Sequence, residues 1–151
     1  VTEQVVGQVA VINAEGLVLG RLCSHVAKRL RKGEEIVIVN AEKAIISGNR
    51  DQLFEFYRHR RNRASSQTKA KGPFYPRTAD MILKRSVRGM VEYKRPAGRA
   101  ALKRLKVYLG LPKEFKDAKL ETLETAKKPH LAKYVKLGEI SKELGARHGV
   151  A

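Results

Sequence analysis

The sequence predicts an α/β fold, and three features of its N-terminal part support that prediction. Residues 9–12 form a run of β-branched residues and alanine, which is typical of a strand buried on both faces of a sheet. Apolar residues spaced three and four apart from Leu19 to Leu30 predict an amphipathic helix, and Gly33 is a natural stop after it. Residues 36–39 repeat the strand pattern. Strand, helix and strand in this order form a βαβ unit, so we expect two parallel strands joined by a right-handed crossover.

The next helix is predicted after residue 49. Asn49 and Gln52 have the spacing of a capping box, in which each side chain binds a backbone N–H of the first turn. Leu53, Phe54 and Tyr57 would anchor this helix on the domain.

Two short helices are predicted between residues 78 and 106. Thr78 is a favourable N-cap for the first, and Asp80 suits its first turn. Helical spacing places Ile82, Leu83, Val87 and Met90 on its inner face and Lys84, Arg85 and Arg88 largely off that face. The second helix follows Pro96, with Ala101, Leu102 and Leu105 inward and Arg99, Lys103 and Arg104 outward.

The C-terminal part has weaker patterns. Residues 107–109 are a short strand candidate, and residues 113–128 alternate Lys with Glu or Asp like a solvated surface stretch. A helix is expected over residues 139–144, where Gly145 would stop it. We expect residues 111–151 to form a peripheral extension that covers the fold.

Composition restricts the function to a few classes. The chain has 151 residues, which suits one domain spanning 1–151, and its pI near 10.3 favours a polyanionic partner. A membrane partner is disfavoured, because no apolar run could span a bilayer and no long basic amphipathic helix is predicted. The first cation is Arg21, so no signal-peptide pattern is present, and a single cysteine fits an intracellular protein.

The positive charge is concentrated in residues 58–106, which we call the basic segment. This segment contains sixteen Lys and Arg residues against two acids, so it holds +14 of the chain's net charge of +17. Ten of the sixteen are arginines, whose planar fork suits phosphate and also stacks on bases. The residues expected to bind nucleic acid are Arg58, Arg60, Arg61, Arg63, Lys69, Lys71, Arg77, Lys84, Arg85, Arg88, Lys94, Arg95, Arg99, Lys103 and Arg104.

Two readings of the basic segment differ in how ordered it is. A disordered arm is the usual form of a Lys-rich block, but the apolar spacing inside residues 78–106 favours helices that hold their cations in place. Residues 60–77 lack such spacing and contain Gly72, Pro73 and Pro76, which predicts a long loop that becomes ordered against its partner. Phe74 and Tyr75 of this loop would either stack on bases or pack on the domain.

Catalytic chemistry has little support in the sequence. The four histidines are scattered without metal-binding spacing, no nucleophile motif is present, and Cys23 lies on an apolar stripe as a core residue. We therefore expect neither an enzyme nor a cofactor. The alternative is a phosphate-binding enzyme that uses the glycine turn 16–21 at a helix N-terminus, although this turn lacks the P-loop and dinucleotide-binding patterns.

Several motifs together resemble those of the L-thirteen family of large-subunit ribosomal proteins, in its archaeal and eukaryotic branch. The motifs are Gly16-Leu-Val-Leu-Gly20-Arg21, Val37-Ile-Val-Asn-Ala-Glu-Lys43, Gly72-Pro-Phe-Tyr-Pro-Arg77, Arg88-Gly-Met90 and Arg104-Leu-Lys-Val-Tyr108. They cover residues 9–112 in the order of the family, and residues 133–142 also look archaeal.

The resemblance implies a three-layer α/β/α fold around a small, mostly parallel sheet. It also implies a structural role on large-subunit ribosomal RNA, beside neighbouring ribosomal proteins, in the cytoplasm and without catalysis. No homo-oligomer is expected. The preference for RNA over DNA rests mainly on this resemblance, and the Arg-rich irregular loop supports it because such loops enter folded RNA. A DNA-compacting protein is the remaining alternative.

Overall fold

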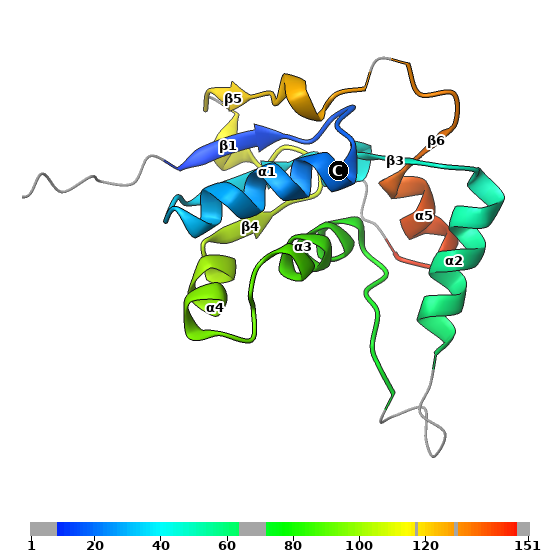
Figure 1. The fold of residues 1–151 in the computed structure, drawn as a ribbon. Coiled ribbons are helices and arrows are strands. Elements are labelled where there is room, and N and C mark those ends of the chain that lie inside the picture. Colours follow the sequence, from blue (N-terminus) through cyan, green and yellow to red (C-terminus); the bar gives the residue numbers. More distant parts are fainter. Residues whose placement is uncertain (1–8, 64–71, 117, 129, 148–151) are drawn as a thin grey trace, which may run out of the picture.

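A parallel four-stranded sheet forms the centre of the protein (Figure 1). The computed structural model describes residues 9–63, 72–116, 118–128 and 130–147. The sheet consists of β1 (Ala10–Asn13), β2 (Ile36–Val39), β4 (Leu105–Val107) and β5 (Leu120–Glu121), in the order β4-β2-β1-β5 with every neighbouring pair parallel. The predicted βαβ unit is confirmed, because β1 and β2 pair in parallel and α1 (Leu19–Arg31) connects them.

The main core lies on one face of this sheet. Helices α1, α3 (Ala79–Met90) and α4 (Pro96–Lys103) cover that face and enclose Ile12, Ile36 and Ile38 of the strands. The opposite face carries a smaller cluster of Val11, Val37 and Val39. Tyr108, Phe115 and Ala118 cover that cluster, from the segment that includes the short helix η3 (Lys113–Phe115). The predicted α/β class with a mostly parallel sheet is therefore confirmed, with a thin layer on the second face.

A second, two-stranded sheet leads into the helix that follows Asn49. Strand β3 (Ile45–Ser47) follows the short helix η1 (Ala41–Lys43) and pairs antiparallel with β6 (Tyr134–Lys136). Helix α5 (Leu137–Glu143) follows β6 directly, and α2 (Arg50–Asn62) stands beside α5 at one side of the molecule (Figure 1). No residue of α2 is fully buried, and partly buried side chains such as Tyr57, which packs against the main core, hold this helix on the domain.

The residues after 111 contribute more to the fold than a peripheral cover would. Ala126 of the short helix η4 (Glu124–Ala126) and Leu137 of α5 are both fully buried in the main core. The stretch 113–128 was expected to be a solvated surface, yet it also supplies β5 at the edge of the sheet. The alternating charges do not form a strand pattern. Only two residues of β5 pair, and the strand forms because β1, far away in the sequence, is its partner.

Several local predictions of element ends need correction. The strand expected at 107–109 begins at Leu105, because Leu105 pairs with Ile36 instead of continuing the preceding helix. Met90 is 44% exposed at the end of α3, so it does not belong to the inner face. Asn49 and Thr78 stand at the N-cap positions of α2 and α3, but neither side chain makes the expected capping hydrogen bond.

The loop predicted for residues 60–77 is also shorter than expected. Helix α2 extends through Asn62, which places Arg60 and Arg61 on a helix. Lys69 and Lys71 lie in 64–71, outside the described residues. The helix continues because Arg and Asn carry no strong helix-breaking property, whereas the prediction relied on the absence of apolar spacing.

None of the described helices has the length and apolar character needed to cross a membrane.

Candidate nucleic-acid interface

Helix α3 holds three cations of the basic segment in fixed directions. Its inner face is formed by Ile82, Leu83 and Val87, which are buried against the core. Because helical geometry ties the remaining side chains to that buried face, Lys84, Arg85 and Arg88 emerge partly exposed beside it. The sequence prediction of their placement is confirmed. These cations belong to a scaffold that buried apolar contacts keep rigid.

Tyr75 connects this helix to α2 through two arginines. The guanidinium carbon of Arg60 lies 4.9 Å from the centroid of the Tyr75 ring, and that of Arg85 lies 4.2 Å from it. Arg85 also donates a hydrogen bond from Nη1 to the carbonyl oxygen of Phe74 at 2.8 Å, and Arg61 donates to that of Tyr75. Residues 72–78 are therefore tied to both helices, and three cations are brought together around one tyrosine.

The pKa values of the two tyrosines beside this cluster are shifted in opposite directions, by charge at Tyr75 and by burial at Tyr57. A hydrogen bond from Arg60, with further attraction from the nearby cations, lowers the pKa of Tyr75 below its ordinary value. Burial raises the pKa of Tyr57, because Tyr57 packs on the main core, although Arg60 acts against that shift. The direction at Tyr75 indicates a local positive potential, which is the condition that attracts phosphate.

A second aromatic contact lies at the other end of α3. The guanidinium carbon of Arg88 lies 4.0 Å from the centroid of the Tyr93 ring. Arg99 donates a hydrogen bond from Nη1 to the carbonyl oxygen of Lys94 at 3.1 Å. The guanidinium carbon of Arg60 also lies 5.1 Å from the centroid of the Phe56 ring, and sequence reasoning identified neither Tyr93 nor Phe56 as a partner of an arginine. The available signal was local, because Arg60 follows Phe56 by four residues on one helix and Tyr93 follows Arg88 by five residues.

Two of the expected nucleic-acid ligands form ion pairs within the protein, and Arg104 is hydrogen-bonded inside the fold. Arg58 forms an ion pair with Glu143 of α5, and Arg95 forms one with Glu92 at 3.0 Å. Both arginines are well exposed, and such pairs hold their charge only weakly, so phosphate can compete for them. Arg104 differs because its Nη2 donates to the carbonyl oxygen of Leu30 at 2.8 Å and its Nε is buried.

The expectation that Arg104 points outward is therefore wrong. Residue 104 caps the end of α4 immediately before β4, where the chain turns back toward the C-terminal end of α1. Its side chain binds the Leu30 carbonyl at that end, which also accepts a hydrogen bond from the N–H of Gly33, and this is a structural role. Arg63, Arg77, Lys94 and Lys103 are exposed, as an interface requires.

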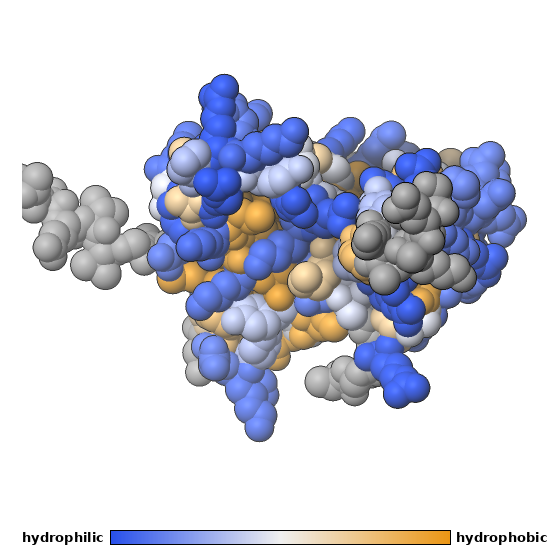
Figure 2. Space-filling model, turned by 90° about the horizontal axis from the view of Figure 1, so that it is seen from below, coloured by the Kyte–Doolittle hydropathy of each residue, from blue (hydrophilic) through white to orange (hydrophobic). Residues whose placement is uncertain are grey.

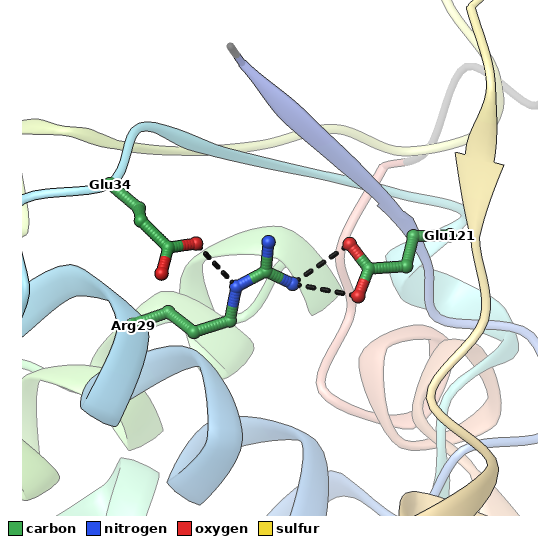
Figure 3. Close-up of polar contacts among 3 residues, drawn as sticks. All are labelled: Arg29, Glu34 and Glu121. Atoms are coloured by element: carbon green, nitrogen blue, oxygen red, sulfur yellow. Dashed lines mark hydrogen bonds and ion pairs between the residues drawn. The ribbon is translucent and has the colours of Figure 1, made fainter. Parts of the chain in front are cut away.

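Arg29, in contrast, is neutralised by two glutamates (Figure 3). Its Nε donates to Glu34 at 2.6 Å, and its Nη1 donates to both carboxylate oxygens of Glu121 at 2.9 and 2.8 Å. Burial opposes the charge of Arg29, but the hydrogen bonds to Glu121 and Glu34 raise its pKa above the ordinary value. This arginine fastens β5 to α1, whereas Arg60, Arg85 and Arg88 make no ion pair among the described residues.

Part of the exposed surface is strongly hydrophilic. Seen from below, hydrophilic side chains occupy most of the face and surround a smaller apolar area (Figure 2). Phe74 is 68% exposed and adjoins the cationic cluster, so it does not pack on the domain. An exposed aromatic ring beside stacked arginines is suited to contact with unpaired bases.

In the glycine turn of the alternative enzyme hypothesis, the first three backbone N–H groups form hydrogen bonds within the protein. The backbone N–H of Gly16 donates to Lys43, that of Leu17 to Ala14, and that of Val18 to Ala126. These three N–H groups are hydrogen-bonded within the fold, so they are not available to bind phosphate. Cys23 is buried, and burial raises the pKa of its thiol to about 12, which confirms it as a core residue.

Comparisons with known proteins agree with the resemblance found in the sequence. The family model described as "Ribosomal protein L13" matches residues 7–114. The chain is 51% identical over 140 residues to the large ribosomal subunit protein uL13 of Methanosphaera stadtmanae, which covers 92% of this chain and 99% of the relative. It is 50% identical over 139 residues to the uL13 protein of Methanococcoides burtonii, with 91% and 98% covered.

A third relative extends this agreement. The uL13 protein of Archaeoglobus fulgidus is 47% identical over 140 residues, which cover 91% of this chain and 88% of that protein. Alignments of this length run past residue 114, so archaeal relatives share part of the segment that supplies β5 and α5. The parallel fold, the motifs and these matches together show that the chain belongs to the L13 family of ribosomal proteins.

Proposed function

We propose that this protein is a structural constituent of the large ribosomal subunit and that it binds folded large-subunit ribosomal RNA through its basic segment. The observation that carries the proposal is that Arg60, Arg85 and Arg88 are held against tyrosine rings and have no carboxylate partner among the described residues. Family membership supports the ribosomal setting, since the relatives are named as large-subunit proteins.

The basic segment acts by neutralising phosphates where separate RNA helices approach each other. Ordered arginines lose little conformational freedom on binding, because cation–π contacts and backbone hydrogen bonds already hold Arg60, Arg85 and Arg88. Contacts of this kind recognise the shape of the RNA, and little base sequence is read. The proposed ligands are the fifteen expected residues except Arg104.

The remaining parts of the proposal concern partners and location. The protein acts as a monomer within the subunit, beside neighbouring ribosomal proteins in the cytoplasm. Its role involves no catalysis and no cofactor. The exposed strand β5 and the C-terminal extension 111–151 are the surfaces that remain for protein neighbours.

The test measures the binding of a large-subunit ribosomal RNA transcript at increasing salt by filter retention. About six to ten phosphate contacts would lower the affinity roughly 10³- to 10⁵-fold between 50 and 200 mM salt. The double variant Arg85→Glu with Arg88→Glu should weaken binding and reduce the salt slope by about two. A circular dichroism spectrum verifies that this variant is folded.

A matched control changes the same amount of charge on the other face of the sheet. The double variant Lys113→Glu with Lys116→Glu alters two exposed lysines of η3 and its end, and it should bind nearly as the unmodified protein does. Equal losses in both variants would indicate a general effect of net charge and refute the assignment of the interface. Duplex DNA as a competitor separates ribosomal RNA binding from DNA compaction, because a DNA-compacting protein would prefer the duplex.

A further inference from the structure

A pocket of about 360 Å³ lies between α2, α3 and residues 72–78. Its position is notable because α2 has little other contact with the domain apart from α5. The volume is at the lower end of the range for small-molecule sites, about 300–1,000 Å³. The pocket therefore has room for a group of the size of one nucleotide.

The charged part of the lining consists of three arginines without an acid. Arg60, Arg85 and Arg88 line the pocket, and none of its lining residues is an aspartate or glutamate. Arg85 and Arg60 lie over Tyr75, and Arg88 lies over Tyr93. When the face of a guanidinium group stacks on an aromatic ring, the N–H groups at its edge stay available. These N–H groups bind phosphate oxygens.

The remaining lining is aromatic and apolar, which a site for phosphate alone would not require. Tyr57, Tyr75 and Tyr93 contribute rings, and Ile82 and Leu144 contribute aliphatic side chains. Flat apolar walls beside planar cations suit a nucleobase, because a base stacks on tyrosine rings and on guanidinium planes. One pocket thus combines the features that recognise a base and the features that recognise its phosphate.

We propose that this pocket binds a single unstacked nucleotide of RNA. The base occupies the pocket against its tyrosine and aliphatic walls, and its phosphate is bound by the edges of Arg85 and Arg88. This inference rests on the proposed function, because the nucleotide belongs to the RNA that the basic segment binds. It goes further by stating that one base leaves its stack, whereas phosphate neutralisation needs no such base.

Gly89 offers a way to fill the pocket without changing any charge. It lines the pocket on helix α3, and a Cβ built at this residue would meet nothing within 4 Å. The variant Gly89→Leu therefore places an aliphatic side chain in the pocket while all three arginines remain. The matched control is Gly20→Leu on α1, where a Cβ also meets nothing within 4 Å and which lies outside the pocket lining.

The experiment measures the affinity of the unmodified protein and both variants for the large-subunit ribosomal RNA transcript at several salt concentrations. We expect Gly89→Leu to weaken binding about tenfold, which corresponds to the loss of one stacked base, with an unchanged salt slope. Gly20→Leu should bind like the unmodified protein. Circular dichroism and urea unfolding verify that both variants are folded.

A second measurement locates the base directly. RNA in which uridines are replaced by 4-thiouridine is irradiated in the complex, and crosslinked peptides are identified by mass spectrometry. We expect crosslinks to Tyr75 or Tyr93, and Gly89→Leu should suppress them.

The outcomes distinguish this inference from the proposed function. Unchanged binding by Gly89→Leu, together with weak binding by Arg85→Glu with Arg88→Glu, would refute the nucleotide pocket and leave the basic interface intact. Equal losses in Gly89→Leu and Gly20→Leu would attribute the effect to an added leucine and also refute the pocket. Unchanged binding by the charge variants would refute the proposed function.

Discussion

The variant Gly98→Ala tests how closely α4 packs against the turn that follows α3. Gly98 is buried in α4, and a Cβ built there would lie 2.0 Å from the carbonyl oxygen of Glu92 and 2.4 Å from its carbon. Both atoms belong to the backbone, so no rotation of a side chain can relieve the overlap. The same carbonyl accepts a hydrogen bond from the N–H of Arg95 at 3.0 Å, which the displacement would disturb.

Two opposing effects determine the size of the change. Alanine is more favourable than glycine in a helix by about 1 kcal/mol, because it loses less backbone entropy on folding. An additional methyl group in filled space costs typically about 1–3 kcal/mol, and we take the upper end because the obstacle is backbone. The free energy of unfolding should therefore fall by about 2 kcal/mol.

Urea unfolding monitored by circular dichroism measures this change. Gly89→Ala is the matched control, since it is also a helical glycine and its Cβ would meet nothing within 4 Å. This control should raise the free energy of unfolding by about 0.5–1 kcal/mol. If Gly98→Ala is as stable as the unmodified protein or more stable, the close approach of α4 to residue 92 is not rigid and the reasoning fails.

Four further predictions concern the ionisable groups. Arg29→Met should lower the free energy of unfolding by about 1–2 kcal/mol, because it leaves the Glu121 carboxylate without its bidentate partner, and urea unfolding measures the loss. In an ultraviolet absorbance titration, Tyr75 should ionise below and Tyr57 above the pH of a free tyrosine. Because the folded-state pKa of Tyr75 is depressed, its ionisation stabilises the fold above the pKa of the unfolded chain, and this stabilisation is lost as the pH falls through the folded-state pKa. The variant Tyr75→Phe should therefore be less stable than the unmodified protein at alkaline pH. Cys23 should not react with a thiol reagent at neutral pH until urea unfolds the chain, whereas rapid reaction in the native protein would contradict its burial.

The local patterns of the chain were sufficient for much of the fold. Helix α1 and strands β1 and β2 follow from apolar spacing and β-branched runs, because each of these elements buries one continuous face or both faces. The inner residues of α3 were predicted for the same reason, except Met90, which lies at the exposed end. Spacing shows which face of a helix is apolar, but not whether the neighbouring element extends far enough to cover its last turn.

The position of β5 and the direction of Arg104 could not be predicted in this way. β5 has two paired residues and an alternating charge pattern, so its identity depends on β1, which lies far away in the sequence. Arg104 looks like any other surface cation until α1 places the carbonyl of Leu30 within its reach. In both cases the deciding partner lies many residues away, and local propensity contains no information about it.

The sequence alone determined that the protein is a basic α/β domain with its excess charge in residues 58–106, because charge and periodicity are properties of the chain itself. The tertiary structure alone decided which cations are free for a partner. Arg29 and Arg104 form hydrogen bonds inside the fold, whereas Arg60, Arg85 and Arg88 lie over tyrosine rings. The physical reason is that a charge becomes available or neutralised according to the groups within a few ångströms, and folding brings those groups together.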